Sequence, residues 1–195
     1  MSTAALRSET HLEVGAFLRF LDSRAGERWE LLDGQPVLMV GGTRAHARIA
    51  GNLLEAVRPQ ARARRCDALA GLLVETPSGS AFEPDLLVEC SPGRPQDRTT
   101  ETPVIVFEVL SPSTMHFDRS EKARRYRAIP SLQQLVFVYQ DSVRVESWLR
   151  QDGEWLPAPH QVLVQREDSL ALPVIAGSLP LAAIYLDVVP NPLCV

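Results

Sequence analysis

The sequence predicts an α/β fold with a mixed central β-sheet flanked by helices. Two observations lead to this prediction. Along the chain the hydrophobic pattern changes period in the order helix, hairpin, helix, strands, helix, hairpin, which is typical of such folds. In addition, six of the seven residues from Val104 to Leu110 are apolar, as expected of a strand that is buried because helices cover both faces of its sheet.

The first two expected elements are a helix and a hairpin. Residues 11–22 predict a helix because their apolar side chains recur on one side, at Leu12, Phe17, Leu18 and Leu21. The segment 28–40, RWELLDGQPVLMV, predicts two strands joined at Asp33-Gly34, since an Asp-Gly pair readily adopts a two-residue hairpin turn.

A second helix is expected from Thr43 to about Val57. Thr43 is a suitable N-cap, and the apolar residues that follow recur on one helix face, which they share with His46. Strand candidates then follow at three places separated by Pro- and Gly-containing turns, near 66–75, 85–90 and 103–110.

The third expected helix follows the loop SPSTMHF. Asp118 and Glu121 match a D-x-x-E variant of the capping box, and Pro130 ends the helix. The remaining expected elements are a second hairpin and, in a proline-rich stretch, a strand and a short helix, at 135–139 with 143–149, 170–175 and 181–186.

Composition places the chain among ordinary globular proteins. Its 195 residues fit one domain with a sizeable core, and 45% of them are hydrophobic and 23% charged. Because no run of about 18 apolar residues occurs, no membrane span is expected, and the N-terminus lacks the pattern of a secretion signal. The net charge of −4 argues against binding duplex DNA through a broad basic face, but allows transient contact through a local patch.

The cysteines predict free thiols. Cys66, Cys90 and Cys194 are far apart, odd in number and form no C-x-x-C pair. We therefore expect a cytoplasmic protein in a reducing compartment, without a structural zinc site.

The basic residues are unusual because 19 of the 20 are Arg and only Lys122 is Lys. An ammonium group is a compact point charge that can lose its proton, whereas a guanidinium group cannot. Lys122 is therefore a candidate functional residue, although a chance position on a solvated helix face is the simpler alternative.

Glu108 interrupts the apolar strand 104–110, where an unpaired carboxylate is costly. Asp85 begins the preceding strand, and adjacent strands would bring its carboxylate close to that of Glu108. Two neighbouring carboxylates repel unless they share a proton or a divalent cation, and oxygen ligands at strand ends suit Mg²⁺ or Mn²⁺. Glu89 is the rival of Asp85, since it shares the same strand face.

Lys122 lies one turn into the helix that returns from the end of the Glu108 strand. This position places an ammonium group and a helix N-terminus beside the predicted metal site. A metal ion, a water molecule and a lysine are the components needed to hydrolyse a phosphodiester. The pattern therefore predicts a metal-dependent phosphodiesterase site.

Several motifs in register resemble the Uma2 family of restriction-endonuclease-like proteins, within the PD-(D/E)xK nuclease superfamily. These motifs are WELLDG, His46, PDLLVEC, VFEVLSPST and D-x-x-x-K-x-x-x-Y from Asp118 to Tyr126. The resemblance spans about residues 10–187 and implies one domain over 1–195, with a restriction-endonuclease-like core that cleaves DNA with Mg²⁺ or Mn²⁺.

The resemblance also implies roles for individual residues. Asp85 and Glu108 would bind the metal, Lys122 would act on the nucleophile, and Glu30 of WELLDG would be the assisting acidic residue. One departure concerns the position two residues after Glu108, which is Leu110 where the superfamily pattern has lysine. In Uma2-like sequences this lysine is moved to the following helix, which matches Lys122.

Alternative interpretations remain open. A nuclease-fold protein without activity, acting as a nucleic-acid-binding or scaffolding module, would suit the acidic net charge. A metal-free acid/base enzyme such as a glycosidase would leave Lys122 unexplained. His46 is expected to be a satisfied core histidine and Tyr126 a half-buried packing residue with a hydrated hydroxyl, and a part in the site is the alternative for each. We also expect a homodimer, because dimers are the commonest assemblies and duplex DNA favours two-fold symmetry.

Overall fold

The computed structural model describes residues 11–91, 93–112 and 115–189. Its helical elements, in chain order, are α1 (Val14–Asp22), α2 (Arg44–Ala63), α3 (Met115–Phe117), the π-helical turn η1 (Asp118–Lys122), α4 (Ala123–Arg127), the 3₁₀ turn η2 (Pro173–Ile175) and α5 (Leu181–Ile184). None of the helices in these ranges is long and apolar enough to cross a membrane.

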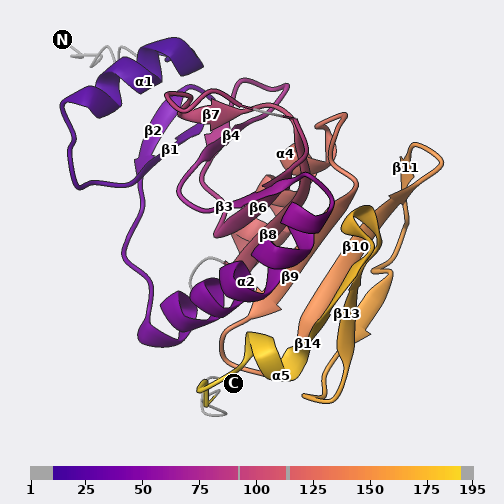
Figure 1. Ribbon diagram of the computed structural model, residues 1–195. Coiled ribbons are helices and arrows are strands. Elements are labelled where there is room, and N and C mark those ends of the chain that lie inside the picture. The colour runs from indigo at the N-terminus through magenta and orange to yellow at the C-terminus, as the bar shows by residue number, and fades with distance from the viewer. Residues whose placement is uncertain (1–10, 92, 113–114, 190–195) are drawn as a thin grey trace, which may run out of the picture.

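A mixed seven-stranded sheet forms the centre of the molecule, as predicted (Figure 1). The strand order is β11-β10-β9-β8-β6-β3, and β12 also pairs with β10. β8 pairs in parallel with β9 and antiparallel with β6. The strands are β3 (Asp67–Leu69), β6 (Leu86–Glu89), β8 (Pro103–Leu110), β9 (Gln134–Tyr139), β10 (Val145–Gln151), β11 (Glu154–Trp155) and β12 (Gln161–Leu163).

Two smaller sheets flank the central one. The first has the strand order β2-β1-β5-β4-β7 and contains the predicted hairpin, in which Asp33 and Gly34 adopt positive φ angles at the turn. The second is the hairpin β13-β14 near the C-terminal end of the described chain (Figure 1). Their strands are β1 (Trp29–Leu32), β2 (Gln35–Leu38), β4 (Leu73–Glu75), β5 (Ala81–Phe82), β7 (Thr99–Thr100), β13 (Ser169–Leu172) and β14 (Gly177–Pro180).

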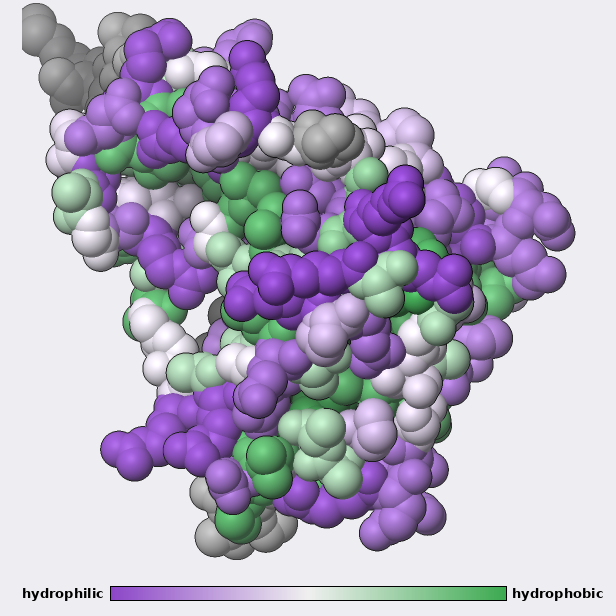
Figure 2. Space-filling model, viewed as in Figure 1, coloured by the Kyte–Doolittle hydropathy of each residue, from purple (hydrophilic) through white to green (hydrophobic). Residues whose placement is uncertain are grey.

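The two faces of β8 pack against different helices. On one face, α2 contributes Ile49 and Leu53 to the core that contains Ile105, Phe107 and Val109. On the other face, α4 contributes Ala123 and Tyr126 to the core that contains Val106 and Leu110. This double cover explains why every residue of β8 except the half-buried Val104 is buried. Hydrophilic side chains cover most of the face shown in Figure 2, and a hydrophobic patch is visible between β4 and α2.

Several helix boundaries differ from the prediction, and α1, for example, begins at Val14 rather than at residue 11. α2 continues past Pro59 to Ala63, since the buried side chain of Ala61 extends the apolar stripe beyond Val57. The third helical segment begins at Met115 rather than Asp118, and Asp118 lies inside this segment as the first residue of η1. The predicted capping box is therefore wrong. The loop residues 113–114 lie outside the described residues.

The prediction of free thiols is also wrong, because Cys66 and Cys90 form a disulfide. β3 pairs antiparallel with β6 so that Asp67 lies opposite Glu89, and the next position along each strand brings the two cysteines together. Because the two cysteines are 24 residues apart in the sequence, no local pattern could indicate that the strand register brings them together. The expectation of a cytoplasmic location was based on free thiols, and the disulfide removes that argument. The cytoplasmic location itself stays a prediction. Cys194 lies outside the described residues.

Candidate active site

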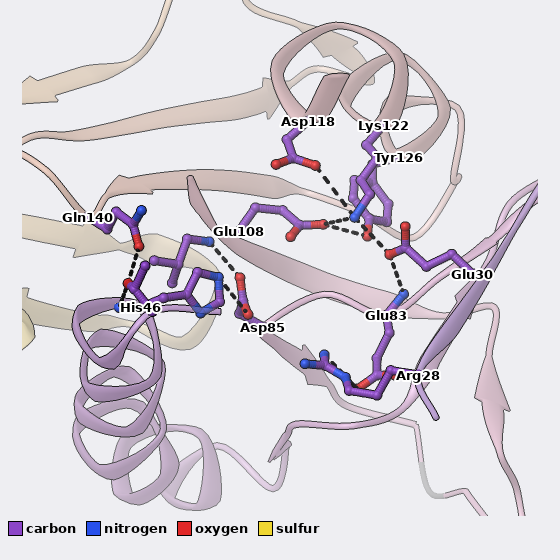
Figure 3. Close-up of polar contacts among 12 residues, drawn as sticks. Arg28, Glu30, His46, Glu83, Asp85, Glu108, Asp118, Lys122, Tyr126 and Gln140 are labelled. Carbon is purple, nitrogen blue, oxygen red and sulfur yellow. Dashed lines mark hydrogen bonds and ion pairs between the residues drawn. The ribbon is translucent and has the colours of Figure 1, made fainter. Parts of the chain in front are cut away.

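The buried carboxylate of Glu108 points away from α2 and toward the helical segment that contains Lys122 and Tyr126 (Figure 3). Glu108 is only 4% exposed, and its Oε1 accepts a hydrogen bond of 2.8 Å from the Tyr126 hydroxyl. The Nζ atom of Lys122 lies 3.6 Å from the same oxygen. Burial raises the pKa of Glu108 well above its ordinary value although Lys122 opposes the rise, and neighbouring carboxylates add to it.

Lys122 is surrounded by acidic side chains (Figure 3). Its Nζ lies 2.7 Å from Glu30 Oε1 and 3.5 Å from Asp118 Oδ1, in addition to its contact with Glu108. Burial by itself would lower the pKa of Lys122, but the three carboxylates together raise it above the ordinary value. Lys122 is therefore a permanent cation near neutral pH, and the proton loss that distinguishes lysine from arginine is not available here.

The π-helical turn η1 explains how one helical segment supplies three polar groups. Asp118 and Lys122 are its first and last residues, and Tyr126 follows four residues later. A π-turn is rare and occurs frequently at functional sites. All three side chains are buried, which requires that they satisfy one another and the strand residues opposite them.

Glu30 reaches the cluster from β1, in the smaller sheet. Its Oε1 accepts hydrogen bonds from Lys122 Nζ and, at 3.1 Å, from the backbone N–H of Glu83. Glu83 follows β5, which pairs with β1, so the smaller sheet holds this carboxylate in place. Burial is the largest influence on the pKa of Glu30 and raises it, against the effect of Lys122.

Asp85 lies at the start of β6, beside Glu108. β6 pairs with β8 so that Leu86 lies opposite Phe107, and the preceding residue of β6 therefore adjoins Glu108. Asp85 Oδ2 accepts a 2.7 Å hydrogen bond from the Val109 N–H, and its Oδ1 lies 3.4 Å from His46 Nε2. The hydrogen bond to Asp85 raises the pKa of His46 above its ordinary value.

A cleft of about 430 Å³ opens beside Asp85 and His46. Arg28 and Glu83 also line it and form an ion pair with a separation of 2.9 Å. The side chain of Asp85 is 12% exposed and that of His46 is 20% exposed, whereas those of Glu108 and Lys122 are 5% and 6% exposed. Of the four carboxylates of Glu30, Asp85, Glu108 and Asp118, that of Asp85 is thus the one that lines this cleft.

The structure brings Glu30, Glu108 and Lys122 into one cluster and places Asp85 at its edge. The expectation for Tyr126 is wrong, because this residue is fully buried and its hydroxyl binds Glu108 instead of water. Asp118, which the sequence suggested as a helix cap, contacts Lys122 in the structure. The regular spacing of Asp118, Lys122 and Tyr126 by four residues was the signal that could have assigned it to the site.

The donor set suits a hard divalent cation. Within the described ranges no group of three or more His, Cys, Asp or Glu side chains is arranged to hold a metal ion. Mg²⁺, however, commonly binds proteins through one or two carboxylates and keeps several water molecules. Lys122 is the single ammonium group among three carboxylates, and Asp85 adds a fourth beside Glu108. Oxygen donors with an excess of negative charge fit this ion.

Comparison with known proteins gives a consistent result. The model of the family Uma2, described as "Putative restriction endonuclease", matches residues 14–183. An uncharacterized protein of Synechocystis is 32% identical over 170 residues, which are 84% of this chain and 86% of that protein. A second uncharacterized Synechocystis protein is 28% identical over 141 residues, or 69% and 80% of the two chains.

A solved structure supports the same fold. It is the crystal structure of a "putative nuclease belonging to DUF820" from Anabaena variabilis. The two structures align with a TM-score of 0.68 over 89% of this chain and 97% of that one, at 15% sequence identity. At this identity the likeness shows the fold, and the predicted α/β core with a mixed sheet is confirmed.

Proposed function

This chain belongs to the Uma2 family, and from that premise we propose that it is a metal-dependent endonuclease that hydrolyses phosphodiester bonds in DNA. The observation that carries the proposal is the imbalance of buried charge. Glu30, Glu108 and Asp118 surround one ammonium group, and a fourth carboxylate, that of Asp85, lines a cleft. A buried excess of negative charge is stabilised by a cation.

Asp85 and Glu108 are the residues that would hold Mg²⁺ or Mn²⁺. Lys122 and Tyr126 both contact Oε1 of Glu108, whereas its other oxygen, Oε2, forms no hydrogen bond or ion pair with any of the described residues. When bound, the ion would act as a Lewis acid toward the scissile phosphate and make water a better nucleophile.

The surrounding residues have supporting roles. Lys122 keeps its charge near neutral pH and would offset negative charge that develops on the phosphoryl group. Glu30 and Asp118 hold the ammonium group in position, and the Tyr126 hydroxyl fixes one oxygen of Glu108. The Val109 N–H and His46 orient Asp85.

The substrate class rests on the family, and the remaining assignments rest on the sequence. We propose DNA as the substrate because the family is described as "Putative restriction endonuclease", and restriction endonucleases cleave DNA. A homodimer, a single domain over residues 1–195 and a cytoplasmic location stay predictions. The inactive alternative also stays open, because a buried Lys122 held by three carboxylates would equally stabilise a fold that no longer cleaves.

Plasmid nicking with Mg²⁺ or Mn²⁺ tests the proposal. We expect the wild type to nick only with the divalent ion, and Glu108→Gln and Lys122→Met to lose about a hundredfold or more of that activity. Glu154→Gln, at an exposed position of β11, is the matched control and should retain it. Equal nicking by all four proteins would reject the assignment.

Titration calorimetry with Mn²⁺ separates the inactive alternative. Saturable binding that Asp85→Asn and Glu108→Gln both remove would support an ion site at these residues. A protein that binds no ion below millimolar concentrations and does not nick DNA would be the inactive form.

A further inference from the structure

A second cavity, of about 670 Å³, lies at the opposite end of β6 from Asp85. Glu89, the last residue of β6, lines it together with residues of β3 and β4 and of the segment 93–102. Its volume lies within the range of small-molecule sites in proteins. Glu89, the sequence rival of Asp85, therefore belongs to a different cavity from the candidate active site.

The cavity has an excess of negative charge. Five acidic residues line it, namely Asp67, Glu75, Glu89, Asp97 and Glu101. Arg94 is the basic residue in the lining, and it is already bound to Asp97 through Nη2 at 3.0 Å and through its backbone N–H at 2.8 Å. The other four acidic side chains form no ion pair with any residue in the described part of the chain.

Glu89 is the strongest sign that the cavity takes a ligand. It is only 6% exposed, yet its carboxylate has no hydrogen-bond or ion-pair partner among the residues that the structure describes. It also lies directly opposite Asp67 in the pairing of β3 with β6, where like charges destabilise a sheet. The Glu89 oxygens are not among the fully buried unpartnered atoms of the described residues, so they face the cavity, where a positively charged ligand would pair with them and relieve the repulsion from Asp67.

A bulge directs this end of the strand. The register between β6 and β8 shifts between Val88 and Glu89. Bulges redirect a side chain, and they are frequent next to functional sites. The shift therefore accompanies the position of Glu89 in the cavity wall.

The lining indicates the chemistry of the ligand. Five acidic residues line the cavity, and no three of them within the described ranges are arranged to hold a metal ion. Leu69, Ala70, Leu72 and Pro95 add apolar surface to the same lining. Several carboxylates that share one cavity with apolar surface match a flexible chain of methylene groups with several ammonium groups. We propose that this cavity binds an aliphatic polyamine.

Titration calorimetry of the full chain with spermidine at low ionic strength tests the proposal, and it requires no nuclease activity. We expect saturable binding at one site, weakened by added NaCl because the attraction is ionic. Glu89→Gln keeps the shape of the side chain but removes its charge, and should weaken binding about tenfold, as expected for one charge-assisted hydrogen bond. Glu154→Gln, which lies outside the cavity, should bind like the wild type.

Thermal unfolding separates loss of binding from loss of structure. Because Glu89→Gln removes a like-charge contact with Asp67, this variant should unfold at or above the temperature of the wild type without ligand. The proposal is overturned if spermidine gives no saturable binding, if Glu89→Gln and Glu154→Gln bind equally well, or if Mg²⁺ at the same ionic strength binds at Glu89 and displaces spermidine.

Discussion

Glu108 and Glu146 are both glutamates buried in strands of the central sheet, but their neighbours differ. Glu146 on β10 is 1% exposed and contacts two arginines, Arg119 at 2.9 Å and Arg144 at 2.6 Å, and the Tyr139 hydroxyl at 3.0 Å. Glu108 shares one ammonium group with two other carboxylates.

The difference separates a structural carboxylate from a candidate functional one. Glu146 is a single acid with two cations, so its negative charge is compensated within the fold. The Glu108 cluster has more acid than cation, and burial keeps the pKa of Glu108 high. A buried charge that the chain itself leaves uncompensated is more informative about function than burial alone.

The largest effect is expected for Lys122→Met. This change leaves three buried carboxylates without their cation and should lower the free energy of unfolding by about 3–5 kcal/mol, as for the loss of one partner of a buried ion pair. Urea unfolding at pH 7 measures it. A loss below about 1 kcal/mol would mean that the cluster is hydrated and that the charge comparison with Glu146 fails.

An intermediate effect on the free energy of unfolding is expected when Glu146 or Glu108 is replaced by glutamine, and the two replacements should have opposite signs. Glu146→Gln removes charge-assisted hydrogen bonds from Arg119 and Arg144, and should lower the free energy of unfolding by about 2 kcal/mol. Glu108→Gln removes uncompensated charge and should raise it by roughly 1 kcal/mol at pH 7 without divalent ions. The same urea experiment decides both, and equal losses at the two sites would refute the contrast.

The smallest expected effect is a dependence on pH of the difference in unfolding free energy between Glu108→Gln and the wild type. The folded pKa of Glu108 lies above its unfolded value, so the folded state binds the proton more tightly. Its contribution to stability is fully present below the unfolded pKa and is lost as pH rises through the folded pKa. The advantage of Glu108→Gln over the wild type should therefore grow as pH rises from about 4.5 toward 8. Urea titrations across that range measure the difference, which a parallel pair of curves would contradict.

Local patterns predicted the long elements well, because each depends on residues that are close in sequence. The apolar run of β8, the Asp-Gly turn between β1 and β2 and the amphipathic face of α2 all lie where expected. The two-residue strands β5 and β7 escaped prediction. Their backbone groups pair with partners far along the chain, which no local pattern can identify.

The sequence predicted those residues of the candidate site whose type is unusual for their position or for the chain. Glu108 was conspicuous in an apolar strand, and Lys122 as the chain's single lysine. Asp118 was assigned as a helix cap because D-x-x-E is a capping pattern, and the structure places its carboxylate beside Lys122. The Asp85 contacts with Val109 and His46 arise from strand register and helix packing.

By itself, the sequence determined the α/β class, the family resemblance and the presence of a buried acid near a single lysine, because composition and periodicity are properties of the chain alone. Only the tertiary structure decided which charges meet: three carboxylates at Lys122, Asp85 beside the cleft, Glu89 in a separate cavity and Cys66 bonded to Cys90. The reason is physical, since electrostatic interaction and disulfide formation depend on distance in space, which strand register and layer packing set.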